Sequence, residues 1–203
     1  MRTRIKVCGI TRPEDALAAV EAGVDGLGFI FVEKSPRNIG PEQAREIIRL
    51  LPPFIDAVGV FVDAEATAVE EIAHYCRLSM VQLHGNESPG YCRDLPLSVV
   101  KAFRVGGDFD GTALAPYDVC VRGFLLDTFH KEMAGGTGET FDWALVQQLA
   151  PARPVILAGG LNPENVKQSA EYVKPYAVDV CSGVRTNNCL DSGKLAAFIA
   201  NLT

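Results

Sequence analysis

Short apolar runs rich in β-branched residues alternate with longer amphipathic stretches along the whole chain. The short runs have the length of buried strands, and the amphipathic stretches have the length of helices. Regular alternation of strand and helix predicts a parallel sheet, because parallel neighbours need a crossover connection. The expected strands cover residues 5–8, 26–31, 56–62, 80–83, 99–103, 123–127, 154–158 and 177–180.

Residues that favour helix starts stand between these runs. Thr11 is a possible N-cap, Pro13 falls in the first helical turn, and Glu14 adds an acid there. The sequence Asn-Pro-Glu-Asn at 162–165 repeats this pattern late in the chain. Besides the helices that begin at these two signals, we expect helices over residues 41–51, 64–76, 88–95, 110–117, 143–149 and 190–202.

Eight strand–helix units in 203 residues leave roughly 25 residues for each unit, which fits a compact (β/α)8 barrel. We therefore predict an α/β protein, a TIM barrel that forms a single domain over residues 1–203. An open doubly wound sheet is the alternative, but it more naturally holds about five or six units. Closing the sheet removes both exposed edges, which favours the barrel. In such a barrel the functional residues follow the carboxyl ends of the strands.

Charge and cysteine spacing narrow the possible partners. The chain has 19 basic and 25 acidic residues, a net charge of −6, and no apolar run near the length of a membrane span. We therefore expect neither a nucleic-acid nor a membrane partner, although a small local anion site is allowed. The six cysteines are spread singly, so we expect no metal site and no disulfide framework. The first residues lack the apolar core of a secretory signal, so we expect a reducing, cytoplasmic location.

Cys8 is the first candidate for acid–base chemistry. It closes the first expected strand and is followed by a glycine and a helix start, so its thiol can face the pocket. Helix N-termini or Lys6 could lower its pKa and make it a usable general base. We expect Lys6 itself to point to the opposite face of the strand, which gives it less weight. A small buried core residue is the structural alternative for Cys8.

Other polar residues also stand at expected strand ends. Asp127 closes the sixth strand, where shielding from water would raise its pKa and let it deliver a proton, unless it only caps a turn. Arg37 follows Ser-Pro after the second strand, and its planar guanidinium suits a carboxylate, with a solvated surface arginine as the alternative. Gln82 and His84 lie at the end of the fourth strand, and we expect them to contact the substrate.

Glycines follow the sixth, seventh and eighth expected strands, where backbone N–H groups can approach a phosphate. Ordinary turn chemistry would explain any one glycine pair. Pairs after both of the last two strands match the phosphate site common in these barrels. The expected phosphate-binding residues are Gly136, Gly159, Gly160, Ser182 and Gly183.

Several motifs occur along the chain in the order found in a known family. They are Lys-Val-Cys-Gly-Ile-Thr at 6–11, Ser-Pro-Arg at 35–37, Val-Gln-Leu-His-Gly at 81–85, Leu-Asp at 126–127, Gly-Gly-Thr-Gly at 135–138, Leu-Ala-Gly-Gly-Leu at 157–161, Val-Asp-Val at 178–180 and Ser-Gly-Val at 182–184. With these motifs the chain resembles the phosphoribosylanthranilate isomerase family of tryptophan biosynthesis. The first motif is distinctive, whereas the glycine-rich motifs occur in many phosphate-binding barrels.

The resemblance implies an Amadori rearrangement of N-(5-phosphoribosyl)anthranilate to 1-(2-carboxyphenylamino)-1-deoxyribulose 5-phosphate, an intramolecular oxidoreduction without metal or organic cofactor. It implies Cys8 as general base, Asp127 as general acid and Arg37 as the ligand of the anthranilate carboxylate. The partner is then a small phosphosugar–anthranilate substrate, and we expect a monomer or homodimer. The chain departs from the family beside the expected phosphate site, where Cys181 replaces a small serine-like residue and Arg185 replaces an acid.

The sequence is also compatible with two other functions. One is a different sugar-phosphate barrel, such as a related aminoaldose isomerase or the indole-forming synthase of the same pathway. Those families tend to place a carboxylate or a lysine, rather than a thiol, at the end of the first strand. The other is a phosphosugar-binding sensor that keeps the anion site and lacks catalysis.

Overall fold

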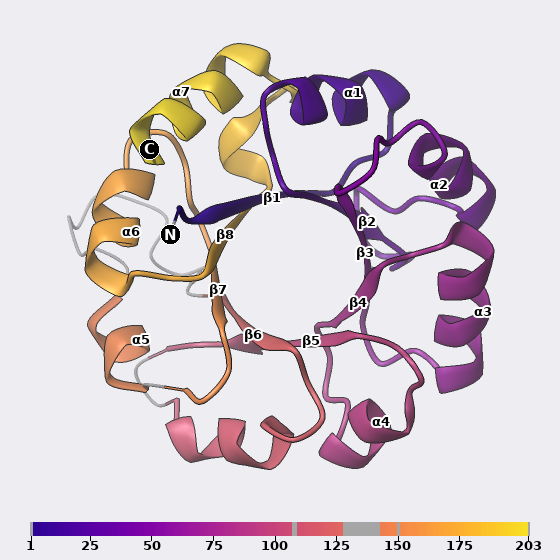
Figure 1. Ribbon diagram of the computed structural model, residues 1–203, viewed down its shortest axis with the longest axis vertical. Helices are drawn as coiled ribbons and strands as arrows, with labels where there is room; N and C mark the ends of the chain where they lie inside the picture. Colours follow the sequence, from indigo (N-terminus) through magenta and orange to yellow (C-terminus); the bar gives the residue numbers. More distant parts are fainter. Residues whose placement is uncertain (1, 107–108, 128–142, 150, 203) are drawn as a thin grey trace.

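A computed structural model describes residues 2–106, 109–127, 143–149 and 151–202. Its strands form a closed parallel barrel in sequence order, with helices around the outside (Figure 1). The first strand pairs with the last as well as with the second, so that Val7 stands opposite both Val180 and Leu27. This closure confirms the predicted (β/α)8 barrel and excludes the open doubly wound sheet.

The barrel strands lie within one residue of the predicted ranges at either end. Their apolar residues are buried on both faces of the sheet, which is why short β-branched runs identify them well. The strands are β1 (Arg4–Cys8), β2 (Gly26–Ile30), β3 (Asp56–Phe61), β4 (Met80–Leu83), β5 (Val99–Arg104), β6 (Gly123–Asp127), β7 (Val155–Ala158) and β8 (Ala177–Val180).

Helices connect the strands, and prolines occupy the first turns of α1, α2 and α4, where no backbone donor is lost. Arg12, and not Thr11, is the N-cap of α1, and it makes no side-chain cap. No helix in the described part of the chain is long and apolar enough to cross a bilayer. The helices are α1 (Pro13–Glu21), α2 (Pro41–Ile48), α3 (Ala66–Cys76), α4 (Pro89–Asp94), the 3-10 helix η1 (Gly111–Tyr117), α5 (Trp143–Leu149), α6 (Val166–Val173), the 3-10 helix η3 (Ser182–Val184) and α7 (Ser192–Leu202).

Helix α6 begins at Val166, three residues later than the proline signal predicts. Asn162 Oδ1 accepts hydrogen bonds from the backbone N–H groups of Glu164 and Asn165, at 2.9 and 3.0 Å. This local turn holds the backbone outside the helical conformation, because the asparagine side chain competes for the same N–H groups. The Asn-Pro-Glu-Asn segment is therefore the turn before the helix and not its first turn.

A short hairpin, β9 (Arg185–Thr186) and β10 (Cys189–Leu190), stands before α7 and includes only the first residue of the predicted helix 190–202. Its two tip residues, Asn187 and Asn188, have φ of 51° and 63°. Asparagine tolerates this left-handed region better than most residues, and two such residues suit a tight hairpin turn. The Asn-Asn pair was the sequence signal for a hairpin that the predicted elements lack.

Alternate residues of the strands belong to two separate apolar layers. Outward-facing side chains such as Val7, Phe29 and Phe124 pack under the helices and are fully buried. Inside the barrel, side chains of β4, β5, β6 and β7 form a second, smaller apolar cluster. Polar side chains that share the inward face lie on the same strands and mark the candidate site described below. The inner cluster consists of Val100, Ala102, Leu125 and Ala158, with Met80 and Ile156 packed against it.

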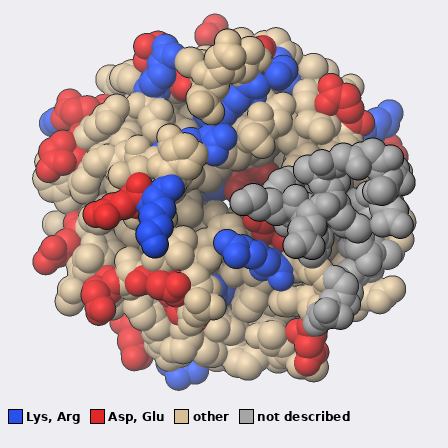
Figure 2. All heavy atoms as spheres, turned by 180° about the vertical axis from the view of Figure 1, so that it is seen from behind, with Lys and Arg blue, Asp and Glu red and all other residues tan. Residues whose placement is uncertain are grey.

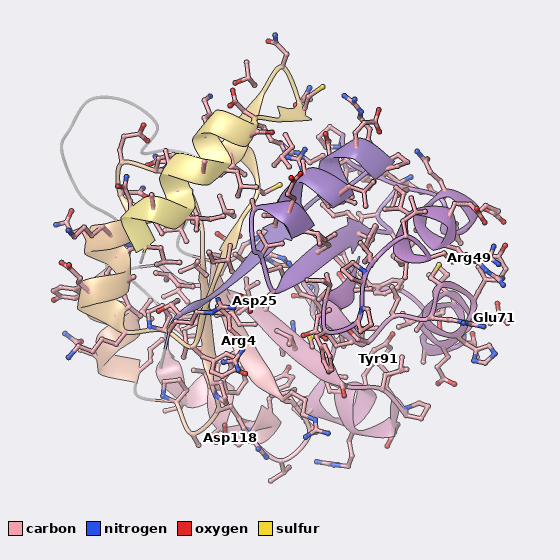
Figure 3. All side chains as sticks on the ribbon, turned by 45° about the horizontal axis from the view of Figure 1, so that its top comes forward. Arg4, Asp25, Arg49, Glu71, Tyr91 and Asp118 are labelled. Atoms are coloured by element: carbon pink, nitrogen blue, oxygen red, sulfur yellow. The ribbon has the colours of Figure 1, made fainter. Side chains whose placement is uncertain are left out.

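The amino-terminal end of β1 is tied to its neighbours. Asp25, just before β2, accepts a hydrogen bond from the backbone of Ile5 at 2.9 Å, and Arg4 places its guanidinium 4.4 Å from the centre of the Tyr176 ring (Figure 3). Asp25 also forms an ion pair with Arg2. These contacts fix the start of the strand whose other end carries Cys8.

Candidate active site

The carboxyl ends of the barrel strands open on the face shown in Figure 2, where Lys, Arg and acidic side chains surround a central hollow. Cys8 ends β1, Asp127 ends β6, and His84 directly follows β4. Gln82 lies inside β4, two residues before His84 and on the same side of the strand. The predicted catalytic and polar substrate-binding residues of these three strands therefore occupy one end of one barrel.

Lys6 shares the inward face with Cys8, so the predicted opposite orientation is wrong. The two residues are two positions apart, and side chains at that spacing point to the same side of a strand. Lys6 Nζ donates a hydrogen bond to Asp179 Oδ1 of β8 at 2.9 Å, and both side chains are more than nine-tenths buried. A methyl group on Gly28 of β2 would lie 2.7 Å from Cys8 Sγ and 3.1 Å from Lys6 Nζ. Glycine at this position leaves room for both groups.

Burial controls the charge states of this cluster. Burial raises the pKa of Cys8 to about 12, and the nearby Lys6 ammonium only partly opposes this effect. The predicted lowering of the Cys8 pKa is therefore wrong, and Cys8 is a neutral thiol at neutral pH. Burial alone would lower the pKa of Lys6, but the Asp179 carboxylate and Cys8 raise it above its usual value. Burial also raises the pKa of Asp179, against the effect of Lys6.

A second polar row faces this cluster across the barrel mouth. His84 Nε2 lies 3.6 Å from Asp127 Oδ2, with side chains that are 21% and 25% exposed. Gln82 Nε2 lies 3.5 Å from His84 Nδ1. If Gln82 donates to Nδ1, the ring proton of His84 is on Nε2 and faces Asp127. Burial lowers the pKa of His84 although Asp127 and Asp179 oppose this, so the imidazole is neutral at neutral pH.

Arg37 follows β2 and lies against the end of β1. A methyl group on Gly9 would come within 2.5 Å of Arg37 Cδ, and the φ of +79° at Gly9 also favours glycine. Arg37 Nε is buried and has no hydrogen-bond partner among the described residues. A buried guanidinium donor without a partner is costly, so this side chain is prepared to bind an anion.

The loops after β7 and β8, which carry four of the predicted phosphate-binding residues, approach each other closely. Gly159 and Gly160 have φ of 96° and 62°, a region that most side chains avoid. A methyl group on Gly183, in η3, would collide with the carbonyl of Leu161, so the two loops approach through backbone alone. Ser182 is the first residue of η3. Gly136 lies outside the described residues.

Arg185, one of the two departures from the family pattern, supports β1. Its guanidinium Nη2 donates to the carbonyl oxygens of Cys8 and Gly9 at 3.0 and 2.8 Å, and Nη1 lies 3.7 Å from Asp15 Oδ2. The arginine therefore holds the backbone of the proposed base. The other departure, Cys181, places its sulfur 3.4 Å from the position of a methyl group on Gly9.

Asp179 is not among the residues predicted to form the site, although the structure places it there. Its signal in the sequence is a single acidic residue inside the apolar run of β8. Lys6 gives the same signal in β1, where one charged residue interrupts an apolar strand that must face a packed interior. The pair is found only when the register of β1 against β8 is known, because Lys6 and Asp179 are partners in that register.

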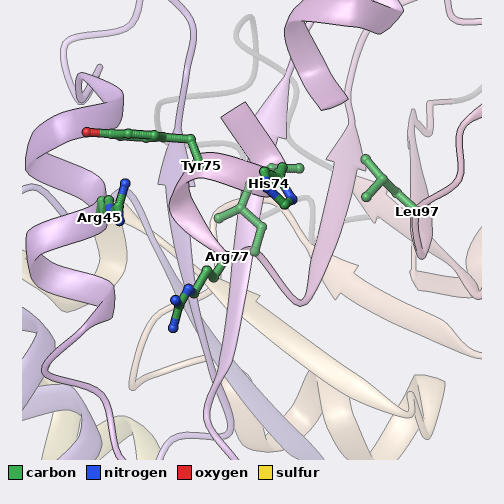
Figure 4. A pocket seen from close by; sticks show the side chains of 7 residues that line it. Arg45, His74, Tyr75, Arg77 and Leu97 are labelled. Atoms are coloured by element: carbon green, nitrogen blue, oxygen red, sulfur yellow. The ribbon is translucent and has the colours of Figure 1, made fainter. Parts of the chain in front are cut away.

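A separate hollow of about 510 Å³ lies in the helical layer, between α2 and α3 (Figure 4). Arg45 places its guanidinium 4.4 Å from the centre of the Tyr75 ring there. Its lining includes residues just before β4 and β5, so the hollow lies away from the carboxyl ends of these strands, and the lining contains neither a thiol nor a carboxylate. It is therefore a poorer candidate for catalysis than the barrel mouth. Its lining is Arg45, Ala73, His74, Tyr75, Arg77, Leu78 and Leu97.

The fold and the site define a class of protein, the TIM-barrel enzymes that perform acid–base chemistry at the carboxyl ends of their strands. A family model described as N-(5'phosphoribosyl)anthranilate (PRA) isomerase matches residues 5–201. The chain belongs to this N-(5'-phosphoribosyl)anthranilate isomerase family.

Individual relatives agree with this assignment over nearly the whole chain. The N-(5'-phosphoribosyl)anthranilate isomerase of Geobacter sp. strain M21 is 52% identical over 199 residues, which cover 98% of this chain and 97% of that protein. The crystal structure of phosphoribosyl anthranilate isomerase from Thermotoga maritima is 42% identical, with a TM-score of 0.86 and 98% coverage of both chains. A structure of the isomerase in complex with reduced 1-(o-carboxyphenylamino)-1-deoxyribulose 5-phosphate is 40% identical, with a TM-score of 0.84 and 98% coverage of both chains.

Proposed function

We propose that this protein is a phosphoribosylanthranilate isomerase of tryptophan biosynthesis. It converts N-(5-phosphoribosyl)anthranilate into 1-(2-carboxyphenylamino)-1-deoxyribulose 5-phosphate by general acid–base catalysis. The observation that carries the proposal is the placement of Cys8 and Asp127 at the same end of one barrel, in a chain that belongs to this family.

Asp127 is the general acid of the first step. It gives a proton to the ring oxygen of the ribose, and the bond between C1 and that oxygen breaks. The nitrogen lone pair of the anthranilate then forms the C=N bond of an iminium ion. Asp127 suits this role because it ends β6, is partly open to the mouth, and has the imidazole of His84 3.6 Å away.

Cys8 is the general base of the second step. Its thiolate takes the proton from C2 of the open sugar, so an S–H bond forms and the C2–H bond breaks. The electron pair of that bond becomes the C1=C2 bond of an enolamine, and the iminium π electrons return to nitrogen. Tautomerisation of the enolamine gives the ketone product. C2 is oxidised and C1 is reduced, so the reaction is an intramolecular oxidoreduction and needs no external electron carrier.

Binding groups on either side of the acid and base orient the substrate. Arg37 holds the anthranilate carboxylate, and its buried Nε, which has no hydrogen-bond partner in the described part of the chain, suits this role. The backbone of Gly159, Gly160, Ser182 and Gly183 holds the phosphate through N–H groups. We also assign Gly136 to the phosphate site from its sequence motif, and Gln82 and His84 to contacts with the substrate.

The remaining expectations extend this proposal. Residues 1–203 form one catalytic domain that acts in the cytoplasm as a monomer or homodimer. Its partner is the small phosphosugar–anthranilate substrate, with no nucleic-acid or membrane partner. The net charge of −6 supports the exclusion of polyanionic partners.

A fluorescence assay tests the function directly. Phosphoribosylanthranilate is generated in situ, its disappearance is followed by fluorescence, and the reduced product analogue serves as inhibitor. We expect enzyme-dependent loss of the substrate signal that scales with protein concentration and is inhibited by the analogue. Binding of the analogue without turnover would favour a phosphosugar sensor, and no binding together with no turnover would favour a different sugar-phosphate barrel. Either of the last two results overturns the proposed function.

A further inference from the structure

Lys6 and Asp179 form an ion pair inside the barrel that the proposed chemistry does not use. Both side chains are more than nine-tenths buried, and Lys6 Nζ lies 2.9 Å from Asp179 Oδ1. A buried ion pair contributes little net stability, since desolvation of two charges offsets their attraction. Net stability therefore does not explain the presence of this ion pair. Its position beside Cys8 points to a role in the candidate active site.

The ammonium of Lys6 has a second neighbour, the sulfur of Cys8. The two groups flank one point, because a methyl group on Gly28 would lie 3.1 Å from Lys6 Nζ and 2.7 Å from Cys8 Sγ. Lys6 and Cys8 project from the same side of β1, while Asp179 reaches Lys6 from β8. One fixed positive charge therefore stands between a carboxylate and the thiol that must become an anion.

We propose that Lys6 is the counter-ion of the Cys8 thiolate, and that Asp179 holds Lys6 in place and competes with the thiolate for its charge. Lys6 is thus a positioning residue that acts through Cys8. This inference deepens the proposed function and rests on it for the catalytic step, although the ionisation of Cys8 can be measured without turnover.

The S–H bond of Cys8 breaks, its proton passes to water, and the electron pair stays on sulfur opposite the ammonium of Lys6. The thiolate later regains a proton from C2 of the sugar. Without Lys6 the same anion would stand in a low-dielectric interior next to the Asp179 carboxylate, which is unfavourable for both.

Other charged or titratable groups also face this cluster. They are the same in the parent protein and in the Lys6 and Asp179 variants proposed below. Cys181 in the segment after β8 and Arg185 in β9 lie beside the end of β1. Arg37 comes from the loop after β2. His84 after β4 and Asp127 of β6 act on Asp179. Among the charged neighbours of Cys8, Lys6 has the largest effect on its pKa and lowers it, whereas Asp179 and Cys181 raise it.

Alkylation of Cys8 by iodoacetamide tests the proposal. At a fixed pH below its pKa, the rate is proportional to the thiolate fraction, so a pKa rise of one unit lowers the rate about tenfold. We expect Lys6→Met to slow Cys8 alkylation by about tenfold or more, and Asp179→Asn to accelerate it. Mass spectrometry of the Cys8 peptide reports the rate, and the buried Cys92 in the same digest reports any general opening. Lys167→Met, on the exposed face of α6, is the matched control for loss of a lysine.

The opposite effects of the two variants distinguish a counter-ion from a structural pair. Disruption of a merely structural pair would change Cys8 alkylation in the same direction in both variants and would expose Cys92 as well. That result, or a Lys6→Met rate within about twofold of the parent protein, overturns the proposal. If Lys6→Met does not fold, Asp179→Asn decides alone, because unchanged or slower alkylation of Cys8 contradicts competition for Lys6.

The pH dependence of kcat/KM supplies the catalytic readout. Lys6→Met should move the alkaline-rising limb to higher pH by about one unit or more, and Asp179→Asn should move it to lower pH, with KM nearly constant. A parent protein without isomerase activity would contradict the proposed function but leave the alkylation result valid. Shifted alkylation with an unshifted kcat/KM limb would instead show that Cys8 is not the base through which Lys6 acts, and would overturn the inference.

Discussion

The two proposed proton-transfer groups lie in different surroundings. Cys8 is 6% exposed and has its pKa raised to about 12, whereas the Asp127 side chain is 25% exposed at the edge of the mouth. A base that is mostly protonated at neutral pH works through a small thiolate fraction, so its rate should follow that fraction. The acid at the edge can exchange protons with water between turnovers. We therefore expect the pH dependence of the reaction rate to follow the ionisation of the Cys8 thiol.

Replacement of Asp127 by asparagine should separate catalysis from binding. Asparagine keeps the shape of the side chain but cannot deliver a proton to the ring oxygen, so we expect kcat to fall by roughly a hundredfold or more with KM little changed. Steady-state kinetics of the fluorescence assay measure both constants. Asp110→Asn, a change to an exposed carboxylate that caps η1, is the matched control and should leave kcat unchanged. A near-normal kcat in folded Asp127→Asn would show that Asp127 is not the general acid.

The buried thiol of Cys8 should make folding stability depend on pH in the alkaline range. Below the ordinary thiol pKa of about 8.5, Cys8 is protonated in both states and its contribution is fully present. Between about 8.5 and 12 the unfolded state loses the proton first, so the free energy of unfolding falls as pH rises. We expect urea unfolding to show that this one residue removes about 2 kcal/mol between about pH 8 and pH 10. Cys8→Ala should lack this loss, and an equally steep decline in that variant would contradict a buried neutral thiol.

The sequence predicted that candidate catalytic residues stand at the strand ends, and the structure places them there, but the charge states could not be predicted. Cys8, His84 and Asp127 could be placed because each stands at the end of a recognisable strand. The direction of the Cys8 pKa shift could not be predicted, because it depends on burial by neighbouring strands. Asp179 could not be paired with Lys6 either, since their contact needs the register of β8 against β1, which is set by barrel closure.

At the scale of elements, a buried ion pair joins β5 to the segments that follow β3 and β4. Lys101 Nζ lies 3.2 Å from Glu87 Oε2, and both side chains are 2% exposed. Lys101 also donates to the carbonyl oxygens on either side of His84, those of Leu83 at 3.3 Å and Gly85 at 2.8 Å. Glu87 accepts from the backbone of Gly85 and of Asp63, which follows β3. The pair therefore fixes the segment that carries His84.

Removal of one partner of the Lys101–Glu87 ion pair should lower the free energy of unfolding. Lys101→Met leaves Glu87 buried without its counter-ion, so we expect a loss of about 3–5 kcal/mol in the free energy of unfolding, measured by urea denaturation. The double variant Lys101→Met with Glu87→Gln should recover part of that loss, because no uncompensated charge is left inside. The control Lys167→Met removes an exposed lysine from α6 and should cost little. A cost below about 1 kcal/mol for Lys101→Met would contradict a constraining role for the pair.

The elements themselves were predictable to different degrees. The barrel strands could be placed within one residue because their apolar runs end at turn residues or at a polar strand end. The ends of the helices were predicted less accurately. Helix α2 stops at Ile48 rather than near residue 51, and α6 starts after the turn made by Asn162. The β9–β10 hairpin was missed because its strands have only two residues each, which is too short for a periodic pattern.

At the scale of the whole molecule, the site joins residues that are far apart in the chain. Arg37 follows β2, Cys8 ends β1, Asp127 ends β6, and the loops proposed to bind phosphate follow β7 and β8. Only closure of β8 onto β1 brings the phosphate loops next to the proposed base. A ligand that spans these loops therefore binds the closed barrel and not the unfolded chain.

Such a ligand should stabilise the entire barrel against heat. Binding to the folded state alone at about 100 times Kd adds about 2.7 kcal/mol, which corresponds to a rise in Tm of roughly 5–11 °C for a domain of this size. We expect this shift in a thermal unfolding scan with the reduced product analogue, as a single transition rather than two. Arg37→Met should bind the analogue more weakly and show a smaller shift at the same concentration, because the carboxylate loses its guanidinium partner. An equal shift in Arg37→Met would place the anthranilate carboxylate elsewhere, whereas a shift confined to one of two transitions would contradict a site built by closure of the whole barrel.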